Sequence, residues 1–268
     1  MAIELEIKDG TPWYLSTDVW VVSDPSDTTE SMPIVGVPCF LKARVSNNGT
    51  TGVTNATVKF YWANPSIGFN RNTANYIGQA FVSLTSGAIQ DVLCLIPWVP
   101  VYLNDGHECL LAEAFHSNDP LPQSPDFNVP IDRHVAQRNL SVVNALKSVF
   151  HFNFEMHNNQ RKQRKFNVNV VQIRLEKLLG NFPLIEKKFD LKNRKEGKLK
   201  SYFFSDSRWP NENLKGREIK QNDFDLPGFG KKHLAIAGQI EGDFVFLTIT
   251  QNEDKFETGG LGILVINL

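Results

Sequence analysis

The sequence predicts an all-β protein of two tandem immunoglobulin-like β-sandwiches. Apolar and polar residues alternate with a period of two along most of the chain, whereas helical periodicity is scarce. Clusters of Asn, Gly and Pro separate the alternating segments at irregular spacings, as is typical of sandwiches. The length of 268 residues indicates about two domains, which we place at residues 1–143 and 144–268.

The first domain contains about seven candidate strands after an alternating N-terminal segment, residues 1–8. In the clearest strand, Leu41 and Ala43 share one face while Lys42 and Arg44 share the other. The expected strands are residues 18–22, 37–45, 56–63, 77–84, 91–97, 108–115 and 135–143.

Four prolines between residues 120 and 130 predict a long ordered loop, because proline cannot donate a hydrogen bond to a sheet. Strand character resumes at Val135. We therefore interpret this loop as a connection within the first domain and not as a linker between domains.

The second domain follows without a Gly/Ser-rich or Pro-rich linker, so we expect a stiff tandem. Its first strand has the cleanest alternation of the chain, with phenylalanines on one face. One helical turn is expected at residues 175–179. The expected strands are residues 150–157, 166–170, 199–204, 232–240, 243–250 and 261–267, of which the last two form a terminal hairpin with a longish loop.

The net charge of −1 conceals an asymmetry between the two halves. Residues 1–140 contain 7 Lys+Arg and 14 Asp+Glu, a net charge of −7. Residues 141–268 contain 21 Lys+Arg and 15 Asp+Glu, a net charge of +6. An acidic domain joined to a basic domain is electrostatically complementary head to tail. We therefore hypothesise self-association, since a contact of this kind produces rings or filaments.

The positive charge is concentrated between residues 161 and 200, which contain 13 Lys+Arg and 4 Asp+Glu. This segment favours contact with an acidic partner. Nucleic acid is disfavoured because few aromatic residues are interleaved, and a solvated face that protects sheet edges is the alternative. The candidate binding residues are Arg161, Lys162, Arg164, Lys165, Lys192, Arg194, Lys195, Lys198 and Lys200.

Composition excludes several classes of protein. No apolar run is long enough for a transmembrane helix. The alternating N-terminus is not typical of a signal peptide, which favours a cytoplasmic protein and leaves leaderless export or surface assembly open. Cys39, Cys94 and Cys109 are too few and scattered for a disulfide framework. They are expected to be small buried apolar residues, although one pair could bridge.

Several segments of the first domain resemble a known family. Residues 36–38 lead into Phe40-Leu-Lys-Ala-Arg-Val-Ser-Asn-Asn-Gly49, and Ala56-Thr-Val-Lys-Phe-Tyr-Trp62 follows. This pattern resembles bacterial immunoglobulin-like modules of the CARDB type, and residues 109–115 and 134–139 resemble the closing strand pair of that family. The resemblance implies a non-catalytic β-sandwich, often an accessory of exported enzymes or surface proteins.

Three groups of titratable residues are candidates for chemistry, and two of them for metal binding. His151, Glu155 and His157 share one face of a strand, where Glu155 and His157 could share a zinc ion and His151 lies too far away. Asp24, Asp27 and Glu30 could hold calcium, although no EF-hand spacing supports this. His107, Glu108, Glu113, His116 and Asp119 spread over about 20 Å of strand. We interpret the first group as a polar solvent-facing surface and the second as an ordinary acidic loop, and the third could not converge without partners from elsewhere in the chain. We therefore expect no metal and no cofactor.

Signatures of nucleophilic catalysis are missing, including the G-x-S-x-G elbow, the P-loop and H-E-x-x-H. The glycine-rich residues 258–262 precede a strand, which indicates a hairpin turn and not a phosphate loop. We therefore expect no catalytic residues, although a hydrolase whose triad is assembled by the fold remains an alternative.

These observations predict a non-catalytic protein-binding or assembly module. Loops that contain Trp13, Tyr14 and Trp98 provide further candidate contacts, with Trp98 counted among the partner-binding residues. The competing function is an accessory carbohydrate- or peptide-binding module of a surface or exported system, with Trp98 and Trp209 as its platform. Glycan binding would quench tryptophan fluorescence with little salt dependence, whereas charge-led assembly would weaken as salt increases.

Overall fold

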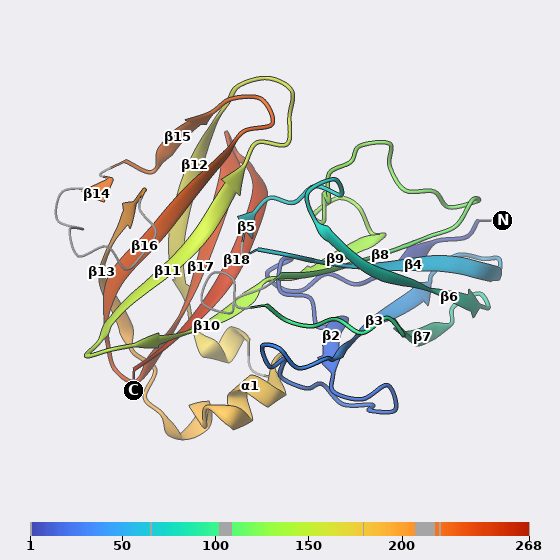
Figure 1. Ribbon diagram of the computed structural model, residues 1–268, viewed down its shortest axis with the longest axis horizontal. Coiled ribbons are helices and arrows are strands. Elements are labelled where there is room, and N and C mark those ends of the chain that lie inside the picture. Colours follow the sequence, from blue (N-terminus) through green and yellow to red (C-terminus); the bar gives the residue numbers. More distant parts are fainter. Residues whose placement is uncertain are drawn as a thin grey trace. The chain divides into compact units, whose positions relative to one another are not determined.

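The computed structural model is almost entirely β and forms two compact units (Figure 1). It describes residues 2–64, 66–101, 109–178, 180–206, 218–219 and 221–267. Unit 1 consists of Met1–Ala63 and Asn70–Asn139, and unit 2 consists of Asn64–Phe69 and Leu140–Leu268. Within the described ranges, helices are too short or too polar to cross a lipid bilayer.

Unit 1 is a sandwich of two antiparallel sheets. In the first sheet the central strand is β3 (Phe40–Asn47). It pairs with the other three strands, which are β1 (Leu5–Glu6), β2 (Val19–Val22) and β7 (Ile89–Leu93). The second sheet has the order β6–β4–β8–β9, with bounds Asn75–Leu84, Val53–Ala63, Cys109–Phe115 and Val135–Arg138. This distribution of consecutive strands over two sheets is an immunoglobulin-like arrangement.

The core of unit 1 follows from the period of two in its strands. Leu41 and Ala43 of β3 face Val58 and Phe60 of β4, and all four side chains are buried. The intervening residues of β3 and β4 point away from this core. The loop with four prolines, after β8, forms no strand and buries Phe127, as the sequence predicts.

Unit 2 is a sandwich of two five-stranded sheets. One has the order β10–β18–β17–β12–β15, with bounds Leu140–Ala145, Phe256–Asn267, Phe244–Glu253, Arg164–Ile173 and Asp223–Leu226. The other has the order β14–β13–β16–β11–β5, with bounds Glu218–Ile219, Lys198–Ser205, Lys231–Glu241, Val149–His157 and Ser66–Ile67. The first strand, β10, runs parallel to the last, β18, and the phenylalanines of β11 lie in the core between the sheets.

Short helical segments cover the outer face of the β10–β18–β17–β12–β15 sheet. They are the 3₁₀ turns η2 (Leu175–Lys177) and η3 (Leu191–Asn193) and the helix α1 (Pro183–Lys188). Because β17 and β18 are therefore buried on both faces there, residues 244–247 and 263–266 are consecutive apolar residues without alternation. The sequence predicts only the turn at η2. It misses α1, whose six residues are too few to show a helical period.

The division between the units differs from the expected one. Residues 135–143 form two strands instead of one: β9 ends at Arg138 in unit 1, and β10 begins at Leu140 in unit 2. Unit 2 also contains β5, which pairs in parallel with β11 at Glu155 and Met156 and covers that sheet edge. Since residues 64–69 and Leu140 carry no charge, the units retain the net charges of −7 and +6.

Two further expectations concern the cysteines and the terminal hairpin. Cys39, Cys94 and Cys109 are buried free thiols, as expected. The terminal hairpin of β17 and β18 is present, but its turn is short, at residues 254–255. Gly259 and Gly260 lie within β18, where they face Gln251 and Thr250, so the expectation of a longish loop is wrong.

Candidate functional site

Trp98 is not the exposed platform that its loop position suggests. Its side chain is only 5% exposed and belongs to the core of unit 1. Its backbone exchanges two hydrogen bonds with Cys39, one donated by each N–H, at 2.8 and 2.9 Å. The neighbouring aliphatic side chains of Leu95, Ile96 and Val99 are exposed instead. The segment therefore presents aliphatic and not aromatic surface to solvent.

A second exposed aliphatic segment lies beside the Trp98 segment. Val37 N–H donates to the carbonyl of Ile34 at 3.0 Å, and Gly36 has a φ of 78°. This is a type II turn, in which only glycine adopts the third position without strain. Gly36 N–H also donates to the carbonyl of Pro100 at 2.9 Å, which ties the two segments together. We define the apolar tip as the exposed residues Ile34, Val35, Val37, Leu95, Ile96 and Val99.

Strand β6 is an uncharged edge next to this tip. Within the described chain it pairs with β4 only, so the backbone N–H and C=O groups on its other side have no partner strand. It contains neither proline nor a charged residue. Tyr76 and Phe81 are 54% and 60% exposed. A register shift in the β4–β6 pairing lets both of them lie on the outer face of the sheet, beside Tyr61 and Thr57.

The apolar tip and β6 form one continuous surface. A Cβ placed on Gly78 of β6 would lie 2.8 Å from Cγ1 of Ile96 and 2.9 Å from Sγ of Cys94, so this segment packs directly on the β6 backbone. We call β6 and the apolar tip together the charge-free face. Its signal in the sequence is a scarcity of charge: residues 31–41 carry none, and Asp91 is the single charged residue between positions 72 and 104.

The structure separates the cationic residues into two groups at opposite ends of unit 2. Strand β16 runs from Lys231 to Glu241. Residues 161–165 follow the end of β11, where His157 pairs with Lys231 at the start of β16, whereas Lys198 pairs with Glu241 at its end. The length of β16 places these ends about 33 Å apart. The pairs Arg164–Glu253, Lys165–Asp223 and Lys200–Glu241, at 3.2, 3.1 and 3.5 Å, already join cationic candidates to carboxylates.

Glu155 and His157 form an ion-paired cluster on β11. Glu155 lies 3.1 Å from Nε2 of His157 and 2.9 Å from Nδ1 of His233, with Nζ of Lys231 at 3.7 Å. Burial works to raise the pKa of Glu155, but the hydrogen bond to His157 and the nearby cations outweigh it and lower the pKa. In the part of the chain that the structure describes, no group of three or more His, Cys, Asp or Glu residues has the arrangement of a metal site.

Sequence reasoning missed a buried charge network in unit 1. Glu113 of β8 is fully buried and accepts hydrogen bonds from Tyr61 Oη at 2.7 Å and Arg71 Nε at 2.6 Å. Nη1 of Arg71 donates to the carbonyls of Ser124 and Asp126, both at 2.9 Å. The network therefore fastens the proline-containing loop to the outer face of the β4–β8 sheet.

A second buried group holds the end of the same loop. Nδ1 of His134 lies 2.7 Å from Asp132, and Nε2 lies 3.2 Å from Asp119. Burial works to lower the pKa of His134, but its hydrogen bonds to these two carboxylates raise it. Asp119 also pairs with Arg133 and accepts from Leu5 N–H at 2.7 Å. These carboxylates are therefore occupied in structural contacts.

The remaining candidates do not converge on a site. Glu30 forms an ion pair with Arg138. The carboxylate of Asp27 instead accepts a hydrogen bond from Asp24 N–H within a turn. Tyr14 is buried, at 2% exposure, so it is not a surface contact. His107, Glu108 and Trp209 lie outside the described residues.

Comparisons with known proteins find distant structural similarities. No family model and no curated protein matches the chain. A CARDB domain from Pyrococcus furiosus, solved with di-metal ions, is 16% identical with a TM-score of 0.29 over 51% of this chain and 90% of that one. The N-terminal domain of PorA is 12% identical with a TM-score of 0.26 over 48% of this chain and 87% of that one.

A red sea bream transglutaminase is similar over the whole of this chain and 31% of its own, at 8% identity and a TM-score of 0.25. The resemblance of the first half to the CARDB type is thus accompanied by a structural match to a CARDB domain over about half the chain. At these scores the similarities carry no argument about function. The assignment of two β-sandwiches rests on the strand order itself.

Proposed function

We propose that this protein is a non-catalytic protein-binding module that self-associates through the charge-free face of unit 1. The observation that carries this proposal is β6, a ten-residue edge strand without charge or proline. Soluble proteins ordinarily protect such edges with lysine, proline or a covering segment, because an open edge pairs with another strand. An edge without lysine or proline, beside exposed aliphatic residues, is therefore typical of a binding surface.

The partner we infer is a second copy of the chain. Unit 1 carries a net charge of −7, so two copies repel each other wherever their charges face. The charge-free face contributes no charge of its own to this repulsion. Antiparallel pairing of β6 with β6 of a second copy is also self-complementary about a two-fold axis. Exposed Tyr76 and Phe81 would then add cross-strand aromatic contacts.

The same observations weaken the alternative functions. A head-to-tail contact between acidic and basic units has less support, because the cationic residues lie at two ends of unit 2 and several already pair with carboxylates. A carbohydrate platform at Trp98 has less support because this side chain is buried. The buried networks of Glu113 and His134 fix a loop in place, which supports a structural role for them.

The test is the oligomeric state across salt concentration. Light scattering coupled to gel filtration is expected to find a dimer with a dissociation constant of about 10 µM. The dimer is expected to persist between about 20 and 500 mM salt, because apolar and backbone contacts are not screened. The substitution Phe81→Lys is expected to weaken dimerisation at least about tenfold, because it places a charge on the edge strand.

The matched control is Val171→Lys on β12 of unit 2, where a similarly exposed side chain receives the same charge. This variant is expected to dimerise like the wild type. A wild-type protein that is monomeric at about 100 µM in both salts would contradict the proposal. Association that disappears at high salt and survives Phe81→Lys would instead support the head-to-tail contact between units of opposite charge.

A further inference from the structure

Three turns meet at one end of unit 2, beyond the end of β11 (Figure 1). They are residues 158–163 between β11 and β12, residues 227–230 between β15 and β16, and residues 254–255 between β17 and β18. Gln160 of the first turn contacts both of the others. Its carbonyl accepts a hydrogen bond from Phe229 N–H at 2.9 Å, and its side-chain amide donates to Glu253, the last residue of β17, at 2.8 Å. The three turns therefore form one surface.

Two phenylalanines on these turns are exposed to solvent. The exposed fraction of Phe229 is 64% and that of Phe256 is 77%. Phe229 also has a φ of 54°, in the left-handed region that a bulky side chain seldom adopts. Residues held in such conformations are concentrated at functional positions. The ring of Phe229 is therefore better explained by contact with a partner than by packing within unit 2.

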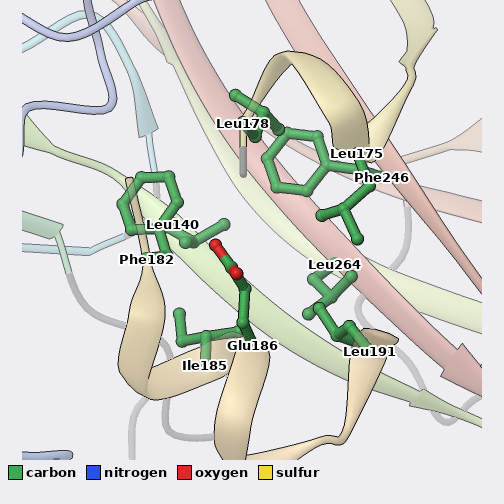
Figure 2. A pocket seen from close by; sticks show the side chains of 9 residues that line it. All are labelled: Leu140, Leu175, Leu178, Phe182, Ile185, Glu186, Leu191, Phe246 and Leu264. Carbon is green, nitrogen blue, oxygen red and sulfur yellow. The ribbon is translucent and has the colours of Figure 1, made fainter. Parts of the chain in front are cut away.

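The other group of cations, residues 192–200, lies in different surroundings. In the helical segments before it, apolar side chains such as Phe182 and Ile185 turn toward the sheet and are buried (Figure 2). Within the described part of unit 2, Phe229 and Phe256 are the exposed aromatic side chains. Exposed aromatic rings are therefore confined to the end of unit 2 where the three turns meet.

The same surface is basic. Residues 158–165, 227–233 and 253–257 contain 7 Lys+Arg and 3 Asp+Glu, a net charge of +4, and all three acidic residues lie at the third turn. Three of the cations already pair with carboxylates, namely Arg164, Lys165 and Lys231. Three others are exposed and form no ion pair within the described chain. We define the basic tip as these three, Arg161, Lys162 and Lys255, together with Phe229 and Phe256.

We propose that the basic tip binds the surface of an anionic lipid membrane. Its three cations would lie against the negatively charged headgroups, which attract Lys and Arg close to the membrane. Its two rings would enter the boundary between headgroups and acyl chains, where aromatic side chains are buried favourably. Exposed aromatic rings beside cations therefore match both properties of such a surface.

Other anionic partners fit the basic tip less well. A single-stranded nucleic acid binds along a groove in which successive bases stack on aromatic rings, whereas the two rings here lie on separate turns. A folded acidic protein would need a shaped pocket for each ring. A bilayer needs neither a groove nor a pocket, because its lipids rearrange around inserted side chains.

The experiment measures by flotation the binding of the full chain to phosphatidylcholine vesicles, with and without about 30% phosphatidylserine. Binding is expected to be at least about tenfold stronger with phosphatidylserine, and to weaken as salt rises from about 50 to 500 mM. The protein is used at about 1 µM, where a dimer with a dissociation constant of about 10 µM is mostly dissociated. The outcome is therefore separate from that of the self-association test.

Two double variants of the basic tip test the two residue types separately. Phe229→Asn with Phe256→Thr removes both rings, since asparagine tolerates the left-handed conformation and threonine suits a strand. Arg161→Gln with Lys162→Gln removes two positive charges. Each double variant is expected to weaken binding to the phosphatidylserine vesicles at least about tenfold, with thermal stability unchanged.

Matched controls lie at the other end of unit 2. Lys195→Gln with Lys198→Gln removes the same charge beside the end of β16, and Leu146→Ser removes a 76% exposed apolar side chain between β10 and β11. Both controls are expected to bind vesicles like the wild type. Four results would each overturn the proposal: no binding at about 1 mM lipid, equal binding to both kinds of vesicle, binding that survives the loss of both rings, or an equal loss on removing either pair of cations.

Discussion

The substitution Arg71→Ala is expected to reduce the free energy of unfolding by about 3 to 5 kcal/mol, because it leaves a fully buried carboxylate without its counterion. Arg71 donates from Nε to Glu113 at 2.6 Å and stacks its guanidinium 4.9 Å from the ring centroid of Phe127. It also holds two carbonyl groups of the proline-containing loop. The loop should therefore loosen together with the loss of stability.

The matched control is Arg44→Ala. Arg44 makes a comparable ion pair with Asp91 at 2.8 Å, but both side chains of that pair are nearly half exposed. Solvent screens such pairs, so we expect a loss of about 1 kcal/mol or less. The measurement is denaturant unfolding of both variants, supported by the rate of proteolysis within the loop. Equal losses for the two variants would mean that the burial of the Glu113 pair has no energetic weight.

A second pair of variants tests the origin of the effect. In Arg71→Met combined with Glu113→Gln, the charge and its counterion are removed together. The introduced glutamine side chain would still accept the hydrogen bond of Tyr61 through its carbonyl oxygen. We expect this double variant to be more stable than Arg71→Ala, because no uncompensated charge stays buried. A double variant as unstable as Arg71→Ala would assign the loss to the loop contacts.

Strands with one buried face could be predicted from the sequence, because burial follows the alternation of residue types. In β3 and β11 every second side chain lies in the core, and both strands were predicted to within three residues of their bounds. The two-residue strand β5 has no period to detect. Its position depends on pairing with β11, which is distant in sequence. Such elements are determined by tertiary contacts alone.

The candidate sites were harder to predict, because exposure within an apolar segment has no local signal. Between Leu95 and Val99 every residue is apolar, so the sequence cannot show that Trp98 is the buried one. The cationic residues illustrate a second difficulty. Residues 161–165 and 192–200 are close in sequence, but strand β12 between them runs along the sheet and carries them apart.

The stability of unit 1 is expected to fall as pH rises from 5 to 8, and Asp9 is the main cause. Burial, together with the negative charges of Glu6 and Asp132, raises the pKa of Asp9 from 3.8 to about 7. Between these two values the unfolded chain has released this proton and the folded chain has kept it. The free energy of unfolding therefore decreases across that window.

His134 and Asp132 complete this pH dependence. The pKa of His134 is raised by its two carboxylate partners, so its contribution is complete below about 6.5 and is lost as pH rises through the folded-state value. Asp132 is buried, but its hydrogen bonds to His134 lower its pKa, so its contribution is lost only on acidification below about 4. Between pH 5 and 8, Asp9 and His134 therefore act in the same direction and Asp132 does not oppose them.

Asp9→Asn isolates the larger contribution. This variant is expected to be more stable than the wild type by about 2 kcal/mol at pH 8, a figure below the full shift because Asp9 is partly exposed. The gain should shrink as pH falls and disappear below 3.8, where Asp9 is protonated in both states. Asp24→Asn serves as the control, because hydrogen bonds from Ser26 lower the pKa of Asp24, and its removal should give no gain. Wild-type stability that rises from pH 5 to 8, or an Asp9→Asn variant no more stable at pH 8, would show that Asp9 ionises in the folded protein as it does in water.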